Sequence, residues 1–321
     1  MSYRICETLE TEKQAMRDVY CQTMIDLANQ NDRIVVMDAD LMNSVGTVPF
    51  GEAHPERTVN CGIQEANMIG VAAGMSAVGM VPYCHTFGCF ATRRCLDQIF
   101  VSAAFAKANI RIIGSDPGIT AAMNGATHMP FEDMALYRTI PGSVVVDATD
   151  VPMLTAFLEM AKDLPGVKYV RVGRKGSCQV YEDGAKFEIG KGQVLREGGD
   201  AVIIACGIMV HEAMQAAAQL AREGIEAAVI DPFTVKPLDD SLIRTYAART
   251  GVVVTAENHN KIGGLYSAVK ECLDGEARVG YVAVEDAFGE VGPQDYLRTR
   301  FDLTWEHIAR QVRETRKKAG R

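Results

Sequence analysis

The chain has 321 residues, of which 48% are hydrophobic and 23% are charged, and its formal net charge at pH 7 is -8. This length favours two domains over one compact core, and the composition is typical of a soluble globular protein. The acidic balance argues against surfaces for nucleic acid or anionic membranes, because phosphate binding needs clustered Lys and Arg. The sequence shows neither an apolar run of membrane-spanning length nor the layout of a signal peptide.

Nine cysteines are scattered through apolar segments. Because their number is odd and their spacing irregular, we expect reduced thiols in a cytoplasmic protein rather than a disulfide framework. Cys84, Cys89 and Cys95 are spaced too loosely for a zinc knuckle. We expect them to be core thiols.

Apolar runs and amphipathic stretches alternate along the chain, as in an α/β fold with buried parallel strands. The strands predicted in the first part are Ile34–Met37, Met80–Tyr83, Ile110–Gly114, Val144–Asp147 and Val167–Val172. The helices predicted there lie near Lys13–Asn29, Gln64–Ala77, Thr92–Lys107, Phe131–Tyr137 and Val151–Lys162.

A polar segment rich in Gly and Lys, Arg174–Gly199, interrupts this alternation and predicts a linker with a small hairpin. A shorter alternation follows it. Its strands are predicted at Ala201–Cys206, Ala227–Ile230, Gly251–Ala256 and Tyr281–Val284, and its helices up to Glu223, at Leu238–Ala247 and at Ile262–Leu273. We therefore expect two α/β domains, residues 1–185 and 186–321, each a mainly parallel sheet flanked by helices.

Three common catalytic signatures are missing from the sequence. It contains no P-loop, no GxGxxG dinucleotide fingerprint and no GxSxG nucleophile elbow. Candidate chemistry must therefore come from a less common arrangement of residues.

Glu65 is a lone carboxylate at the start of a predicted helix whose other positions are almost all small or apolar. An acid in the first turn of a helix ordinarily compensates the helix dipole. A helix that is apolar nearly all round is instead typical of a buried element, and a buried carboxylate needs a partner. On these residues alone, Glu65 is either a first-turn acid or a functional carboxylate.

Two further segments carry candidate functional residues. Phe87 and Phe90 lie three apart just after a predicted strand, where aromatic residues either fill a core or wall a flat ring. His128 lies in a long loop with Gly and Ala residues, and a loop histidine is a stronger catalytic candidate than one on an apolar face.

Taken in order, these blocks resemble the transketolase family. The matching blocks are the helix of Glu65, the Phe pair, GATHMPFEDMALYRTIP (125–141) and ENHNKIGGLYSAVKE (257–271). The GDG…N signature, with which full-length transketolases bind Mg²⁺ and diphosphate, is missing. The resemblance therefore implies the carboxy-terminal subunit of a split transketolase, whose separate amino-terminal partner holds the diphosphate and the Mg²⁺ or Ca²⁺, with no metal ligand on this chain.

The resemblance also implies a cofactor and roles for individual residues. In this family thiamine diphosphate performs the electronic step, and a carboxyl group against the N1′ atom of its pyrimidine ring promotes the reactive tautomer. Glu65 matches this carboxyl group, Phe87 and Phe90 match the residues that pack on the ring, and His128 matches the histidine that hydrogen-bonds the donor. The implied reaction is transfer of a two-carbon ketol unit from a ketose to an aldose by an α2β2 assembly.

The far end of an anionic sugar is expected to contact Arg17, Ser44 and Arg174, which fall where the family places such contacts. Each also has an ordinary interpretation, as a solvated helix position, a loop residue and a linker charge respectively.

Three departures from the family pattern bear on the substrate. Ser115 stands where the well-known enzymes have a phosphate-contacting histidine, and Asn124 stands where an aspartate reads a donor hydroxyl. Arg93 replaces an aromatic residue near the cofactor ring. The donor is therefore expected to be a ketose with a phosphate or another anionic tail, such as a sulfonate.

Two other functions also fit these residues. The β subunit of a 2-oxo acid dehydrogenase has a related architecture, and a regulatory subunit would keep the α/β fold without the chemistry. We assign no role to His54, His85, His211, His259 or His307.

Overall fold

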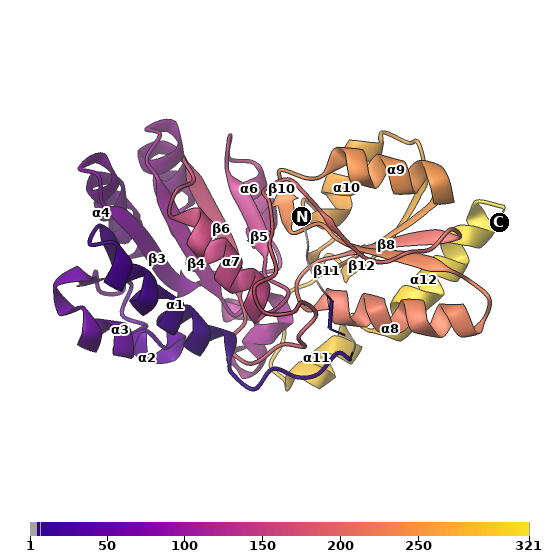
Figure 1. Cartoon of the computed structure of the whole chain (residues 1–321), viewed down its shortest axis with the longest axis horizontal. Helices are drawn as coiled ribbons and strands as arrows, with labels where there is room; N and C mark the ends of the chain where they lie inside the picture. Colours follow the sequence, from indigo (N-terminus) through magenta and orange to yellow (C-terminus); the bar gives the residue numbers. More distant parts are fainter. Residues whose placement is uncertain (1–4, 7, 321) are drawn as a thin grey trace.

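The computed structural model describes residues 5–6 and 8–320, which form two lobes, each built around one sheet (Figure 1). The first sheet has seven strands in the order β10-β5-β6-β4-β3-β1-β2, and the second has five in the order β12-β11-β8-β9-β7. Neighbouring strands are parallel except in the pairs β10–β5 and β7–β9. The predicted architecture of two mainly parallel sheets flanked by helices is confirmed.

The elements have the following bounds. The first sheet contains β1 (Ile34–Asp38), β2 (Thr58–Asn60), β3 (Val81–Phe87), β4 (Ile110–Ser115), β5 (Val144–Asp147), β6 (Val167–Val172) and β10 (Thr234–Lys236). The second contains β7 (Gln193–Arg196), β8 (Ala201–Ala205), β9 (Ala227–Asp231), β11 (Val252–Asn260) and β12 (Arg278–Val284). The helices are α1 (Met16–Gln30), α2 (Met42–Val45), α3 (Val48–Ala53), α4 (Glu65–Ala77), α5 (Leu96–Gln98), α6 (Asp133–Arg138), α7 (Val151–Ala161), α8 (Met209–Arg222), α9 (Asp240–Thr250), α10 (Leu265–Leu273), α11 (Gln294–Arg300) and α12 (Trp305–Lys318). Shorter pieces are the π-helix η2 (Ile99–Phe105) and the 3₁₀ helices η1 (Pro55–Arg57), η3 (Gly118–Asn124) and η4 (Ala126–His128).

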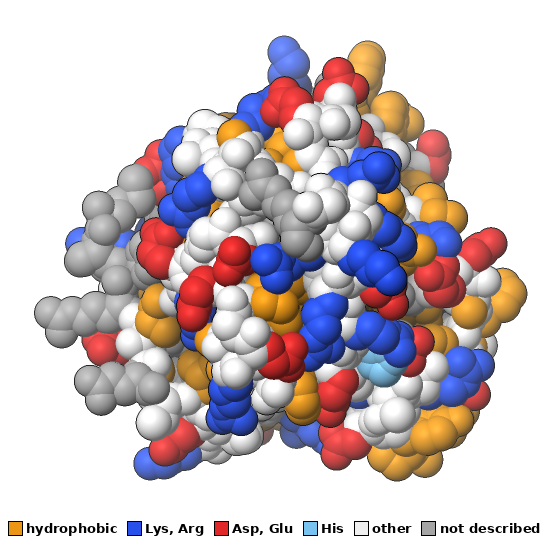
Figure 2. Space-filling view, turned by 90° about the vertical axis from the view of Figure 1, so that its right-hand side faces the viewer, with side chains coloured by type: hydrophobic (Ala, Val, Ile, Leu, Met, Phe, Trp, Pro, Cys, Tyr) orange, Lys and Arg blue, Asp and Glu red, His pale blue; other side chains and the backbone are white. Residues whose placement is uncertain are grey.

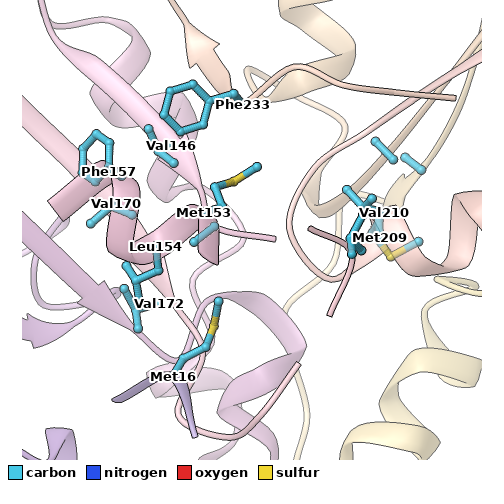
Figure 3. Packing of buried hydrophobic residues seen from close by; sticks show 14 of the residues in the cluster. Met16, Val146, Met153, Leu154, Phe157, Val170, Val172, Met209, Val210 and Phe233 are labelled. Carbon is cyan, nitrogen blue, oxygen red and sulfur yellow. The ribbon is translucent and has the colours of Figure 1, made fainter. Parts of the chain in front are cut away.

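The first sheet is buried on both faces because successive side chains of a strand point to opposite sides. On β3, Tyr83 packs in a core cluster with residues of α1 and α7, whereas Cys84 packs in a second cluster with residues of α4 and η2. The first of these clusters continues into the second lobe. Figure 3 shows members from both lobes: Val146, Met153, Leu154, Phe157, Val170 and Val172 from one, and Met209 and Val210 from the other.

Two predicted helices begin later than expected, and the predicted hairpin is wrong. The helix expected over Thr92–Lys107 begins only at Leu96 and continues as the π-helix η2, and the Thr92 hydroxyl donates 2.7 Å to the carbonyl of Gly88 in the turn before it. The helix expected from Phe131 begins at Asp133. No hairpin forms among the described residues of 174–199: Cys178 and Tyr181 bridge to the amino-terminal segment, and β7 pairs with β9.

The nine cysteines are unpaired, and Cys84, Cys89 and Cys95 are buried, as predicted for core thiols. Among the described residues, none of the helices has the length and hydrophobicity needed to cross a membrane. Figure 2 shows acidic and basic side chains intermingled over the face of the second lobe that it draws.

Arg171 of β6 is fully buried and connects the two lobes. Its Nε donates 2.8 Å to Oδ2 of Asp133 on α6, and its Nη1 donates 2.8 Å to Oδ2 of Asp147 on β5. Its Nη2 donates 2.9 Å to the carbonyl of Asn258, which lies on β11 of the other sheet. A buried guanidinium is tolerated only with such complete pairing.

We expect Arg171→Met to lower the free energy of unfolding by about 3–5 kcal/mol, because it leaves two buried carboxylates without their cation. The control is Arg249→Met, which breaks an exposed ion pair with Glu197 and should cost less than about 1 kcal/mol. Urea titration followed by circular dichroism measures both. Equal effects would contradict the central role of Arg171.

Candidate active site

The predicted site residues follow the carboxyl ends of neighbouring parallel strands. Phe87 is the last residue of β3, Ser115 is the last residue of β4, and Arg174 lies two positions beyond β6. Because β3, β4 and β6 are adjacent and parallel, these residues share one edge of the sheet. Ligands of open α/β sheets bind at this edge.

Glu65 is the first residue of α4, and its side chain is 1% exposed. Nη1 of Arg94 donates to both carboxylate oxygens, at 2.9 and 3.0 Å. The guanidinium of Arg94 also lies 4.0 Å from the ring centroid of Phe90. The partner that a buried carboxylate requires is therefore Arg94. The sequence analysis missed this residue. The two adjacent arginines that follow Phe90 in the sequence could have indicated a partner for Glu65.

Two aromatic rings and one imidazole form a row next to this ion pair. The ring centroids of Phe87 and Phe90 are 6.0 Å apart. His128 packs edge-on against both, at 5.7 Å from Phe87 and 5.2 Å from Phe90. Its Nδ1 lies 2.8 Å from the hydroxyl of Thr127. The structure thus brings together the Phe pair and the loop histidine, which the sequence separates by about forty residues.

Arg93 holds the loop of His128 in place. Its Nη2 donates 3.1 Å to the carbonyl of Thr127, and its Nε lies 3.2 Å from Oε1 of Glu132. Burial raises the pKa of Glu132, and the positive charge of Arg93 partly offsets this rise. Arg93 therefore contacts the residue next to His128 rather than the carboxylate of Glu65.

A second carboxylate–arginine pair lies at the other end of the row. Nε and Nη2 of Arg174 donate to Oδ2 of Asp116 at 3.1 and 2.7 Å. The guanidinium lies 5.2 Å from the ring centroid of Phe87. The hydroxyl of Ser115 is buried and lies 3.5 Å from the same oxygen of Asp116. The structure therefore places Asp116, which the sequence analysis did not consider, against the predicted tail-binding cation.

Arg17 and Ser44 lie beside this pair. Nη1 of Arg17 donates 3.1 Å to the backbone carbonyl of Ser44. Arg17 and Arg174 line the same cavity of about 350 Å³. Burial raises the pKa of Asp116, and the positive charges of Arg174 and Arg17 partly offset this rise. Ser44 contributes its backbone carbonyl to the contact with Arg17, and it does not belong to the described residues that line the cavity.

Asn124 is exposed at the end of η3. Within residues 5–6 and 8–320, its side chain makes no hydrogen bond to the row of Phe87, Phe90 and His128.

The start of the loop that contains Asn124 is held by Asn258 of the second lobe. The side chain of Asn258 accepts from the amide of Ile119 at 3.0 Å and donates to the carbonyl of Pro117 at 3.0 Å. Gly118 between them has φ +52, and a Cβ there would lie 2.2 Å from Oδ1 of Asn258. Only glycine suits this close approach between residue 118 and Asn258.

The comparisons with known proteins decide the family. Residues 12–176 match the model of the transketolase pyrimidine binding domain, and residues 190–308 match that of the transketolase C-terminal domain. The chain belongs to the transketolase family. Thiamine diphosphate dependence follows from this membership, and the 2-oxo acid dehydrogenase alternative finds no support in it.

The transketolase relatives include separate subunits of similar length. The chain is 44% identical over 308 residues to the 6-deoxy-6-sulfo-D-fructose transketolase subunit SqwH of Clostridium sp. (strain MSTE9), covering 95% of this chain and 96% of that protein. It is 34% identical over 306 residues to an apulose-4-phosphate transketolase subunit of Phocaeicola vulgatus, covering 95% and 98%. It is also similar to the solved structure of a split gene transketolase, an inactive beta4 tetramer, with a TM-score of 0.87, 39% identity and coverage of 95% and 99%. The chain is accordingly a transketolase subunit.

We expect Arg94→Met to destabilise the isolated subunit by about 1–3 kcal/mol, because it leaves the buried carboxylate of Glu65 unpaired. Arg313→Met is a matched control, since Arg313 is about as exposed as Arg94 and binds Glu223 through two hydrogen bonds, but Glu223 is partly exposed. Its loss should cost less than about 1 kcal/mol. Urea unfolding compares the two variants. Equal losses would mean that burial of Glu65 does not govern the pair.

Proposed function

We propose that this chain, together with a separate amino-terminal subunit, transfers a two-carbon ketol unit from a ketose with an anionic tail to an aldose. The observation that carries this proposal is the continuous row from Glu65 and Arg94 through Phe90, His128 and Phe87 to Arg174. A buried carboxylate stands at one end of this row and a partly exposed guanidinium at the other.

The residues present suit the pyrimidine ring of thiamine diphosphate. Glu65 offers a carboxylate in a nearly water-free position, and Phe87 and Phe90 offer two aromatic faces next to it. Arg94 is half-exposed, so its side chain has room to leave the carboxylate. When bound, thiamine diphosphate supplies the electron sink for cleaving the bond next to the ketose carbonyl.

The chain's own groups have four tasks in this reaction. Glu65 holds a proton at the pyrimidine N1′ atom, and the apolar surroundings strengthen this hydrogen bond. Phe87 and Phe90 pack on the ring and exclude water. His128, held between both rings, hydrogen-bonds the hydroxyl and carbonyl oxygens of the donor. Arg17 and Arg174 bind the anionic tail, with Ser44 and Asn124 at the rim of the substrate site.

A partner subunit is proposed from two observations. The elements α4 and η2 contact each other, and several apolar side chains on or next to them are exposed. They form the α4–η2 surface, which consists of Ile63, Val78, Phe100, Val101 and Phe105. An exposed apolar surface of this kind is suited to burial against another chain. The similar split gene transketolase is an inactive tetramer of one subunit type. As the family resemblance implies, the proposed partner carries the diphosphate and its Mg²⁺ or Ca²⁺, in an α2β2 assembly within the cytoplasm.

The division of the chain at residue 185 is part of this proposal. The two family models match on either side of it, over residues 12–176 and 190–308. The strand β10 nevertheless pairs with β5 of the first sheet, so the second domain contributes one edge strand to the first.

The tail of the donor is proposed to be a sulfonate or a phosphate. The relative with 44% identity acts on 6-deoxy-6-sulfo-D-fructose, whereas the one with 34% identity acts on apulose 4-phosphate. The higher identity and the departures at Ser115, Asn124 and Arg93 favour the sulfonate.

The complete enzyme is tested by mixing the chain with a candidate amino-terminal subunit, thiamine diphosphate and Mg²⁺. We expect ketol transfer from 6-deoxy-6-sulfo-D-fructose to D-glyceraldehyde, with the products detected by mass spectrometry. This chain alone should show no transfer. Decarboxylation of a 2-oxo acid without ketol transfer would contradict the proposal.

Substitution of the carboxylate tests the catalytic centre. Glu65→Gln should lower kcat by about 10²–10⁴-fold, because the amide cannot exchange a proton with the pyrimidine ring. The control Glu314→Gln removes an exposed carboxylate on α12 and should leave kcat unchanged. Binding of thiamine diphosphate is measured by tryptophan or tyrosine fluorescence. It should weaken for Glu65→Gln and stay unchanged for Glu314→Gln. Full activity of Glu65→Gln would favour a regulatory subunit.

A further inference from the structure

Arg174, the cation proposed to bind the tail of the donor, already has a carboxylate partner in the protein. Asp116 is 1% exposed, and its Oδ2 accepts two hydrogen bonds from Arg174. These bonds use Nε–H and one N–H of Nη2. Within the described residues, Nη1 of Arg174 makes no recorded hydrogen bond, so this side of the guanidinium is available for a ligand.

The position of Asp116 is built into the sheet. Its amide donates 3.1 Å to the carbonyl of Val172 at the end of β6. Its φ is +58, a left-handed conformation that Asp and Asn adopt more readily than most residues. Backbone and side chain together therefore fix the carboxylate behind Arg174.

The charged groups around this pair are mostly cationic, with Asp116 and Glu12 as the two carboxylates among them. Arg174 faces Asp116 from the segment after β6, and Arg17 faces it from α1. The cavity in front of them is also lined by Lys13, Lys175 and Glu12. Asp116 therefore cancels one of the positive charges that a tail would meet.

We propose that Asp116 is a specificity-determining residue, which selects a singly charged sulfonate tail over a dianionic phosphate. This inference rests on the proposed function. A phosphate monoester carries a charge of about -1.5 to -2 at pH 7, because its second pKa is about 6. A sulfonate has the same three acceptor oxygens but carries one charge throughout the neutral range. The fixed negative charge of Asp116 repels the second charge of the phosphate and costs the sulfonate less.

Asp116→Asn removes this charge and keeps an oxygen that accepts from Arg174, and Asn suits the left-handed backbone. With the partner subunit, thiamine diphosphate and Mg²⁺, kcat/KM is measured for 6-deoxy-6-sulfo-D-fructose and for D-fructose 6-phosphate. D-Glyceraldehyde is the common acceptor, because it has no anionic tail. We expect the ratio of phosphate to sulfonate kcat/KM to rise on the order of tenfold in Asp116→Asn. The control Asp163→Asn changes the net charge equally at an exposed site and should leave the ratio unchanged.

A second measurement uses the unaltered enzyme. Its kcat/KM for the phosphate donor, divided by that for the sulfonate donor, should rise as the pH falls from 8 to 6, because protonation turns the phosphate into a monoanion. This pH dependence should weaken in Asp116→Asn. An unchanged ratio in the variant, or a flat profile for the unaltered enzyme, would overturn the role of Asp116 while leaving ketol transfer intact. Failure to transfer from either donor would overturn the proposed function and this inference with it.

Discussion

The buried guanidinium of Arg171 fixes the relation between the two lobes, and the site depends on that relation. Its two carboxylate partners come from α6 and β5, and its third partner is a backbone carbonyl of β11. The same stretch of β11 supplies Asn258, whose side chain holds the start of the loop that ends at His128. The second sheet thus positions the loop of His128, which belongs to the first lobe, without itself contacting the substrate in the proposed function.

The site has the same arrangement at both of its ends. Glu65 and Asp116 are buried carboxylates, and each is held by a partly exposed arginine. Each arginine also lies over one ring of the Phe pair, Arg94 over Phe90 and Arg174 over Phe87. An arginine beside a buried carboxylate offsets part of the free energy that desolvation of the charge costs. In the proposed function one of these carboxylates contacts the cofactor ring, and in the further proposal the other reduces the positive charge that the tail of the donor meets.

Some local predictions departed from the structure, in part because non-local contacts override the sequence pattern. The helix expected over residues 92–107 shortens because a threonine hydroxyl bonds a backbone carbonyl in the preceding turn. The hairpin expected after Arg174 does not form because its segment bridges to the distant amino-terminal residues. The strand β10 joins the first sheet although it follows the second alternation in sequence. Pattern and propensity describe neighbours along the chain, whereas the last two pairings are made with residues far away in it.

The sequence by itself determined the α/β class, the two sheets and the family, because buried parallel strands read as continuous apolar runs and the motif blocks occur in order. It also predicted roles for Glu65, the Phe pair, His128 and Arg174, which lie in one row in the structure. Only the tertiary structure decided which charges face one another: that Arg94 rather than Arg93 binds Glu65, and that Asp116 lies against Arg174. Such pairings follow from the distances between side chains on different strands and helices, and spacing along the chain does not encode these distances.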